Sequence, residues 1–218
     1  MDLLMRHNSF DRYLQDSEAI DQKNPKIQFT AQFLMDKMMR ELDEDPEKAL
    51  PDPEMQLART TYEYVRDRIS HSCDIQNALI TWKASAVLEK KHGLCYAKSH
   101  LLAALLRANG IPAGMCYQCL RLDGTQQSEL ILHGLNAVCF ASIGRWVRLD
   151  ARGNKPGIAA EFSVTEEKLA FPVHPGLQET DIPIIFACPD RTVLLTLQKY
   201  ENLPELMENL PQKLFGDE

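Results

Sequence analysis

Along the first half of the chain, apolar residues recur every three or four positions. This spacing is typical of helices that bury one face against a core. The helices that it predicts cover residues 8–22, about 28–43, 55–69, 83–92 and 95–109. Between the second and the third, the acidic and proline-rich stretch 43–53 predicts a connection with at most one short helical turn.

Polar and glycine residues mark the ends of these helices. Asn24-Pro25 ends the first, and Gly110-Ile111-Pro112 ends the last. Ser85 is a plausible N-terminal cap for the helix over 83–92, and Gly93 a C-terminal stop. The last helix carries apolar residues over a wide arc, which predicts that it is buried on most sides.

The second half of the chain changes to short apolar runs that are separated by turn residues, a pattern typical of strands. The runs cover residues 113–122, 132–141 and 145–150, with Gly144 in the turn between the last two, and two short later elements cover 183–187 and 192–198. Helices first and strands afterwards predict an α+β fold, in which a central helix packs on an antiparallel sheet.

The length of 218 residues suits one domain. We expect this domain to consist of a helical N-terminal extension over 1–55, a core over 56–155 and a C-terminal extension over 156–218. Apolar residues and two prolines in the stretch 203–218 predict a short helix that packs on another surface.

Composition narrows the classes of partner. The chain is 44% hydrophobic and 25% charged, as in an ordinary globular protein, and its net charge is −7. No segment is rich in Lys and Arg, so we expect no nucleic-acid partner. Neither a secretory leader nor an apolar run of about 18 residues is present, so we expect a cytoplasmic protein without membrane contact. Six scattered cysteines fit reduced thiols better than a disulfide framework.

One cysteine lies at a position that favours a nucleophilic thiolate. Gly93-Leu94-Cys95 places a thiol at the start of the buried helix over 95–109. Unpaired N–H groups and the positive end of the helix dipole favour the thiolate there, which is the nucleophilic form. The ordinary alternative is a buried and inert thiol. We assign that alternative to the other five cysteines, which are Cys73, Cys116, Cys119, Cys139 and Cys188.

A histidine and an aspartate lie downstream at the edges of predicted strands. His133 on an apolar strand is more often a core residue than a catalyst, and Asp150 alone is an ordinary strand-end residue. A hairpin that turns near Gly144 brings Asp150 back to the level of His133, so that the two side chains become diagonal neighbours. The carboxylate can then orient the imidazole and stabilise its cation.

These three segments together resemble the bacterial transglutaminase-like superfamily. The similarity rests on Gly93-Leu94-Cys95-Tyr96-Ala97, Leu132-His133-Gly134-Leu135-Asn136-Ala137 and Trp146-Val147-Arg148-Leu149-Asp150, and it covers roughly residues 60–155. The resemblance implies a papain-like core with a Cys-His-Asp triad, in which Cys95 is the nucleophile, His133 the base and acid, and Asp150 the orienting group. It also implies no cofactor, and the chain is too short for the further domains of the calcium-regulated members.

Acyl chemistry also needs donors for an oxyanion. The backbone N–H of Cys95 is one candidate, because it lies at a helix start. Trp82, Gln76 and Asn77 lie upstream, where a second donor is expected, and the indole N–H of Trp82 resembles the aromatic donor of some transglutaminases. The more frequent role for such a tryptophan is a core or pocket-wall aromatic.

Two other features of the sequence are weaker candidates for a functional site. Cys116 and Cys119 have a two-residue gap, but residues three apart on a strand face opposite sides, so we expect no metal site. His100 lies about 140° around the helix from Cys95 and is a poor candidate base.

Two functions follow from the sequence. The first is a cysteine-dependent acyl-transfer enzyme that acts on a peptide, protein or small amide substrate through a thioester, by hydrolysis or amine transfer. The alternative is a binding or scaffold protein that keeps the fold without the activity.

Overall fold

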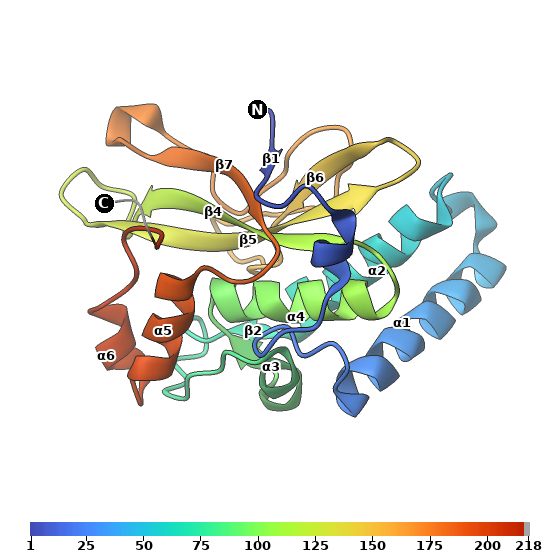
Figure 1. Cartoon of the computed structure of the whole chain (residues 1–218), viewed down its shortest axis with the longest axis horizontal. Coiled ribbons are helices and arrows are strands. Elements are labelled where there is room, and N and C mark those ends of the chain that lie inside the picture. Colours follow the sequence, from blue (N-terminus) through green and yellow to red (C-terminus); the bar gives the residue numbers. More distant parts are fainter. Residues whose placement is uncertain (216–218) are drawn as a thin grey trace.

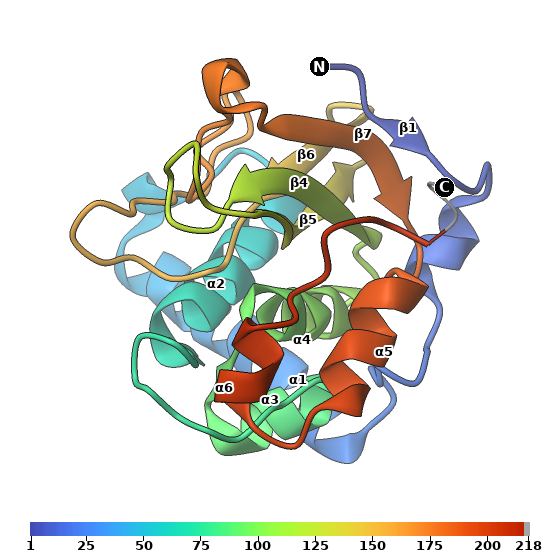
Figure 2. The ribbon, with the colours of Figure 1, turned by 90° about the vertical axis from the view of Figure 1, so that its left-hand side faces the viewer.

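A curved sheet lies across a group of helices in the computed structural model, which describes residues 1–215 (Figures 1 and 2). The strand order is β1-β7-β4-β5-β6. The bounds are Leu4–Met5 for β1, Ala113–Arg121 for β4, Leu130–Phe140 for β5, Arg145–Leu149 for β6 and Thr180–Phe186 for β7. All neighbours are antiparallel except β1 and β7, which are parallel.

The helices gather mainly on one side of this sheet (Figure 2). The α-helices are α1 (Pro25–Glu44), α2 (Pro53–Arg68), α3 (Ala84–Lys90), α4 (Cys95–Ala108), α5 (Arg191–Lys199) and α6 (Leu203–Met207). The 3₁₀ helices are η1 (Phe10–Leu14), η2 (Pro46–Lys48) and η3 (Pro175–Leu177). A separate parallel pair consists of β2 (Ser70–His71) and β3 (His92–Gly93). The predicted α+β class, with a central helix on a sheet, is confirmed.

Helix α4 is the centre of the molecule. Each residue from Tyr96 to Arg107 is buried, and the helix packs on α1, α2, α3 and β5. Leucine and alanine around the whole circumference explain this position, because only a helix without a polar face loses nothing by complete burial. The polar side chains of α4 are paired instead of solvated: the Arg107 guanidinium, for example, donates to the carbonyls of Gln15, Ala113 and Ala187.

The opposite face of the sheet is covered by the N-terminal segment. Tyr13 packs there with Leu135, Ala137 and Ile185, and its hydroxyl donates to the Ile185 carbonyl at 2.9 Å. Trp146 meets the Tyr13 ring edge-on at a centroid distance of 4.9 Å. Both faces of the central strands are therefore buried, which holds the sheet firmly against α4.

Proline and a capping residue start the first two long helices. Asn24 and Asp52 are the N-terminal caps of α1 and α2, and each side chain accepts a backbone N–H two residues later. Pro25 and Pro53 follow directly at the first helical position, where a missing N–H costs nothing. The break that the sequence placed at residues 24–25 is thus also the beginning of α1.

The predicted helix over 8–22 was largely wrong. Only Phe10–Leu14 is helical, as a 3₁₀ turn, and the chain beyond it is held by local bonds such as that from the Gln22 amide to the Leu14 carbonyl. The short element over 192–198 is the helix α5.

The predicted ends of α3 were also wrong. Ser85 does not cap the helix, because its N–H and hydroxyl both bond to Asp21 on the neighbouring segment. Lys91 ends the helix in the left-handed conformation with φ 60°, and Gly93 continues into β3.

The end of the chain partly follows expectation. Within the predicted helical stretch 203–218, residues 203–207 form α6, and residues 216–218 lie outside the described part. In residues 1–215, no helix is both long enough and apolar enough to cross a membrane.

Candidate functional site

Cys95 is the first residue of α4 and is half-buried. No side chain caps this helix start, so its first N–H groups remain available to a ligand. Gly93 makes the sharp approach possible, because a Cβ at this position would lie 3.0 Å from the Ala97 Cβ and 3.2 Å from the Thr81 Oγ1. The sequence Gly-Leu-Cys therefore places a thiol at an open helix N-terminus.

Hydrogen bonds set the register between the start of α4 and β5. The Tyr96 hydroxyl donates to the Leu132 carbonyl, the Ser99 hydroxyl to the Gly134 carbonyl at 3.2 Å, and the Asn136 amide to the Ser99 carbonyl at 3.0 Å. A Cβ on Gly134 would lie 2.8 Å from the Tyr96 ring and 3.2 Å from its Cα. Glycine at this position lets the strand approach the helix closely enough to bring its neighbour, His133, to Cys95.

The hairpin of β5 and β6 brings His133 and Asp150 together. Asn136 pairs with Leu149, so Asp150 follows directly and is a diagonal neighbour of His133. The His133 Nε2 and the Asp150 Oδ2 are 2.8 Å apart. This contact confirms the pairing that the sequence predicted.

Asp150 is held as an anion. Its Oδ1 accepts the Arg152 N–H at 3.0 Å, and its Oδ2 accepts the Ala170 N–H at 3.2 Å. The Tyr62 hydroxyl donates to its carbonyl at 3.1 Å and fixes the backbone. Burial raises the pKa of this carboxyl, but His133 and the two N–H donors outweigh burial and lower the pKa below its usual range.

His133 is fully enclosed but charged. Burial lowers its pKa, whereas the charge of Asp150, the charge of Cys95 and hydrogen bonds to both side chains raise the pKa to about 10. Because Nε2 faces Asp150, we infer that Nδ1 is the nitrogen that meets the Cys95 sulfur. Phe171 packs edge-on against the imidazole, with ring centroids 5.0 Å apart, and limits its rotation.

Lys98 supports the site from within α4, one turn after Cys95. Its Nζ donates to the carbonyls of Ile69, Arg152 (2.9 Å) and Arg66 (3.3 Å), and the side chain is fully buried. Burial lowers its pKa to about 7. Sequence reasoning missed this residue, although a lysine near the start of a helix that is apolar over a wide arc is the signal that could have found it.

Ion pairs surround Asp150. The Arg152 guanidinium binds Asp74 through two nitrogens, and Lys155 binds the same carboxylate at 2.6 Å. His71 lies close by and carries an unpaired, buried Nδ1, and burial lowers its pKa to about 3. The imidazole of His71 therefore stays neutral next to these cations.

The upstream candidates for an oxyanion donor lie in the segment between α2 and α3. Trp82 is half-buried under Lys83, and its carbonyl lies 2.7 Å from the His100 Nδ1. The Asn77 side chain accepts the Leu79 N–H, and Gln76 sits in a turn at φ 52°. Within residues 1–215, these side chains form no hydrogen bond with Cys95, His133 or Asp150.

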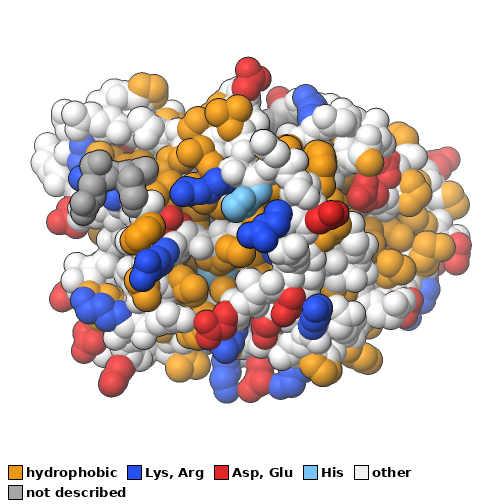
Figure 3. Space-filling view, viewed as in Figure 1, with side chains coloured by type: hydrophobic (Ala, Val, Ile, Leu, Met, Phe, Trp, Pro, Cys, Tyr) orange, Lys and Arg blue, Asp and Glu red, His pale blue; other side chains and the backbone are white. Residues whose placement is uncertain are grey.

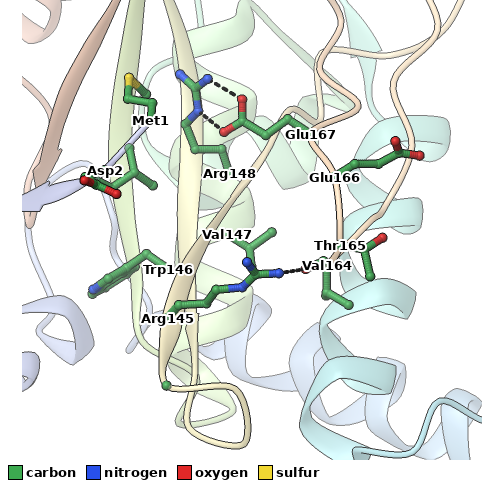
Figure 4. A pocket seen from close by; sticks show the side chains of 12 residues that line it. Met1, Asp2, Arg145, Trp146, Val147, Arg148, Val164, Thr165, Glu166 and Glu167 are labelled. Atoms are coloured by element: carbon green, nitrogen blue, oxygen red, sulfur yellow. Dashed lines mark hydrogen bonds and ion pairs between the residues drawn. The ribbon is translucent and has the colours of Figure 1, made fainter.

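A cavity of about 480 Å³ opens beside His133. Its walls come from the β4–β5 turn and the loop before β7, and they include Leu120, Ile131, Ala170, Phe171 and Pro172. A cavity of about 510 Å³ lies instead between the N-terminus and β6, and none of the three predicted triad residues lines it (Figure 4). We therefore associate the chemistry with the cavity at His133, because reactive groups and not volume define a site.

The second cavity contains an ion pair between its lining residues, formed by Arg148 and Glu167. Arg148 forms two bonds to Glu167, at 2.7 and 2.6 Å, and Arg145 donates to the Val164 carbonyl (Figure 4). On the surface, cations and anions are interspersed and no large patch of one sign dominates the face in Figure 3.

The described residues contain no group of three His, Cys, Asp or Glu side chains that could hold a metal ion. All six thiols are free. Cys116 is buried and Cys119 is half-buried, three residues further along β4.

Comparison with known proteins gives a family match. Residues 40–151, just over half of the chain, match the transglutaminase-like superfamily. No curated protein matches.

Solved structures are similar only at low identity. A candidate cysteine protease from Cytophaga hutchinsonii is 17% identical with a TM-score of 0.48, and the match covers 67% of this chain and 43% of that one. A candidate protease from Parabacteroides distasonis is 16% identical with a TM-score of 0.39, covering 65% and 25%. A protein described as a TGase is 19% identical with a TM-score of 0.37, covering 63% and 35%. The chain thus spans less than half the length of each.

Proposed function

The chain belongs to the transglutaminase-like superfamily, and from this membership we propose that it is a cysteine-dependent acyl-transfer enzyme acting on amide or peptide bonds. The observation that carries the proposal is the 2.8 Å contact of the His133 Nε2 with the Asp150 carboxylate, on a strand that is hydrogen-bonded to the start of α4, where the charge of Cys95 contributes to the raised pKa of His133. A nucleophile, a base and an orienting carboxylate in contact are the arrangement of a catalytic triad.

The reaction proceeds in two halves. The Cys95 thiolate attacks the carbonyl carbon of the amide, and the imidazolium of His133 gives its proton to the departing amine as the C–N bond breaks. A thioester on Cys95 results. Water or a second amine then loses a proton to His133 and attacks the thioester, and the C–S bond breaks to release the acyl product. Asp150 holds the imidazole in place and stabilises its cation throughout.

Two donors complete the proposed mechanism. The backbone N–H of Cys95 at the uncapped helix start is the first oxyanion donor. The indole N–H of Trp82 is the second candidate, and its backbone is anchored to α4 through His100. We expect Trp82→Phe to slow turnover by about 10²–10³-fold if the N–H binds the oxyanion. Unchanged turnover would assign Trp82 to the wall of the site.

The cavity beside His133 is where we propose that part of the substrate binds. Leucine, isoleucine, phenylalanine and proline side chains line it together with the charged side chains of Arg121, Asp123 and Glu179. A substrate side chain with an apolar body and a polar end therefore suits it best.

The first experiment measures thiol reactivity without needing a substrate. The folded protein is treated with a limiting amount of iodoacetamide at pH 7.5, and each alkylated cysteine is identified by peptide mass spectrometry. We expect Cys95 to react faster than the exposed Cys188, although it is less accessible. The preference should disappear in urea, because it depends on folded surroundings. Preferential labelling of Cys188 or Cys116 with Cys95 inert would overturn the proposal.

The second experiment measures turnover. Dansylcadaverine incorporation into casein reports amine transfer, and peptide release from labelled casein reports hydrolysis. Cys95→Ser should abolish either signal, whereas Cys119→Ser, which removes another half-buried thiol, should not. Selective labelling of Cys95 without turnover of amide probes would favour the binding or scaffold function.

A further inference from the structure

A second thiol lies beside the proposed nucleophile. In the parallel pair of β2 and β3, His71 is opposite Gly93, and the next residue, Ser72, still donates its N–H to the Gly93 carbonyl at 3.1 Å. Cys73 lies two residues after His71, and Cys95 lies two residues after Gly93. Paired strands are about 4.8 Å apart, so the turn that carries Cys73 and the start of α4 that carries Cys95 both leave this pair from neighbouring positions. A disulfide needs Cα atoms about 4.4–6.8 Å apart, and two residues of chain on each side are enough to reach that separation.

The electrostatics of Cys73 report the same proximity. Burial raises its pKa, and the charge of Cys95 is the largest contribution after burial, ahead of Arg152 and Asp74. Both thiols are half-buried, so small molecules can reach them. Cys73 is therefore a protonated thiol at neutral pH that stands next to the reactive one.

The C-terminal segment holds Cys73 in this position. Its Sγ is 3.6 Å from the Met207 Sδ at the end of α6, and the Leu203 N–H donates to the Ala78 carbonyl at 2.8 Å. The segment that follows α2 accordingly lies beside α6 (Figure 2). The thiol is thus confined between α6 and the start of α4.

We propose that hydrogen peroxide converts Cys95 and Cys73 into a reversible disulfide, which blocks the nucleophile and protects it from further oxidation. The regulatory meaning of this disulfide rests on the function proposed above, whereas its formation does not.

The steps balance as follows. The Cys95 thiolate attacks one peroxide oxygen, the O–O bond breaks, and the released hydroxide takes a proton to leave as water, so that Cys95 becomes a sulfenic acid. The Cys73 sulfur then attacks the Cys95 sulfur, the S–O bond breaks, and hydroxide leaves as water with the Cys73 proton. Two thiols lose two electrons and two protons in total, and one peroxide becomes two waters. A dithiol reductant reverses the disulfide by exchange.

The test is peptide mapping of the whole protein after a short treatment with hydrogen peroxide and alkylation of the remaining thiols. Trypsin separates the two cysteines into the peptides 69–83 and 92–98, each with a single thiol. We expect these peptides to appear joined, and dithiothreitol to release them and restore the alkylation of Cys95. In Cys73→Ser, we expect Cys95 to be oxidised further to sulfinic acid, which dithiothreitol does not reduce. The alkylation of Cys95 after dithiothreitol should then be at least several-fold lower than in the unchanged protein.

Cys119→Ser is the matched control and should oxidise and recover as the unchanged protein does. The proposal is overturned if no joined peptide forms, or if recovery is the same with and without Cys73. Joined peptides in a protein without amide turnover would sustain the redox pair and reject the enzyme. Amide turnover without joined peptides would do the reverse.

Discussion

At the scale of single residues, the protonation of His133 depends on two opposing effects. Removal from water disfavours the imidazolium, yet the charges of Asp150 and Cys95 more than compensate, and the pKa rises to about 10. An imidazole held with its proton can give that proton to a departing amine. The environment of His133 thus keeps the imidazole protonated before the first half of the proposed reaction, whereas an isolated histidine is mostly neutral at neutral pH.

Asp150→Asn tests this account, because asparagine keeps the shape and an oxygen acceptor but removes the charge. We expect the pKa of His133 to fall from about 10 towards its ordinary value or below, because the charge of Asp150 no longer counteracts the effect of burial. Amide turnover should fall by about 10²–10⁴-fold. Titration of the imidazole Cε1 proton by NMR measures the pKa directly.

Asp74→Asn is the control for Asp150→Asn. It removes a carboxylate that pairs with Arg152 and Lys155 but does not contact His133. The pKa of His133 should hardly change in this variant. An unchanged His133 pKa in Asp150→Asn would show that the carboxylate does not set it.

At the scale of elements, the site depends on how closely β5 approaches the start of α4. Tyr96 and Ser99 each donate from the helix to a carbonyl of the strand, and Asn136 donates back to the helix. Gly134 is the point of closest approach. These contacts convert two separate sequence motifs into one site, because they fix the thiol and the imidazole relative to each other.

Gly134→Ala should separate the two elements. The added Cβ would meet the Tyr96 ring at 2.8 Å and its Cα at 3.2 Å, so either the strand or the helix start must move. We expect a loss of about 1–3 kcal/mol in the free energy of unfolding, measured by urea denaturation, together with slower alkylation of Cys95. Gly176→Ala, where a Cβ meets no atom within 4 Å, should change stability by less than about 0.5 kcal/mol. Equal effects of the two changes would refute the close-approach argument.

At the scale of the whole molecule, two buried groups pull the pH dependence of stability in opposite directions. The folded pKa of Lys98 is lowered from 10.5 to about 7, so above pH 7 the unfolded chain binds the extra proton and stability rises with pH. The folded pKa of His133 is raised from 6.5 to about 10, so its contribution is complete below pH 6.5 and declines as pH rises towards 10.

Between pH 7 and about 8.5, where free cysteines begin to titrate, these two slopes should nearly cancel. Each amounts to at most about 1.4 kcal/mol per pH unit. We expect the unfolding free energy of the unchanged protein to be almost flat in this window. It should fall with pH in Lys98→Met and rise with pH in His133→Gln, as measured by urea denaturation at several pH values.

The His133→Gln arm keeps the pH test decisive if Lys98→Met does not fold. A flat profile in both variants would contradict the opposite shifts. Below pH 6.5, the lowered pKa values of the buried His71 and His100 both favour the unfolded chain, because these two groups bind protons only when the protein unfolds. The free energy of unfolding should therefore fall as the pH is lowered.

Local pattern was enough to predict most elements and the three proposed catalytic residues. The helix at Cys95, the two strands and the turn at Gly144 all follow from spacing and turn residues, because these depend on neighbours in the chain. The diagonal contact of His133 with Asp150 followed too, because a tight hairpin leaves little freedom of register. The predictions of the first helix and of the ends of α3 were wrong. At the ends of α3, Asp21 on a distant segment binds Ser85, and Lys91 adopts a conformation that glycine favours.

The amino-acid sequence was therefore sufficient to predict the family, the fold class and the order of the proposed catalytic residues. The surroundings of these residues could be read only from the folded chain: Lys98 binds three carbonyls from two other segments, Phe171 flanks His133, and Cys73 follows the strand β2 that pairs with β3 just before Cys95. The physical reason is the range of the interactions. Helix and turn propensities act over a few residues, whereas desolvation, charge and packing depend on every group that the fold brings near.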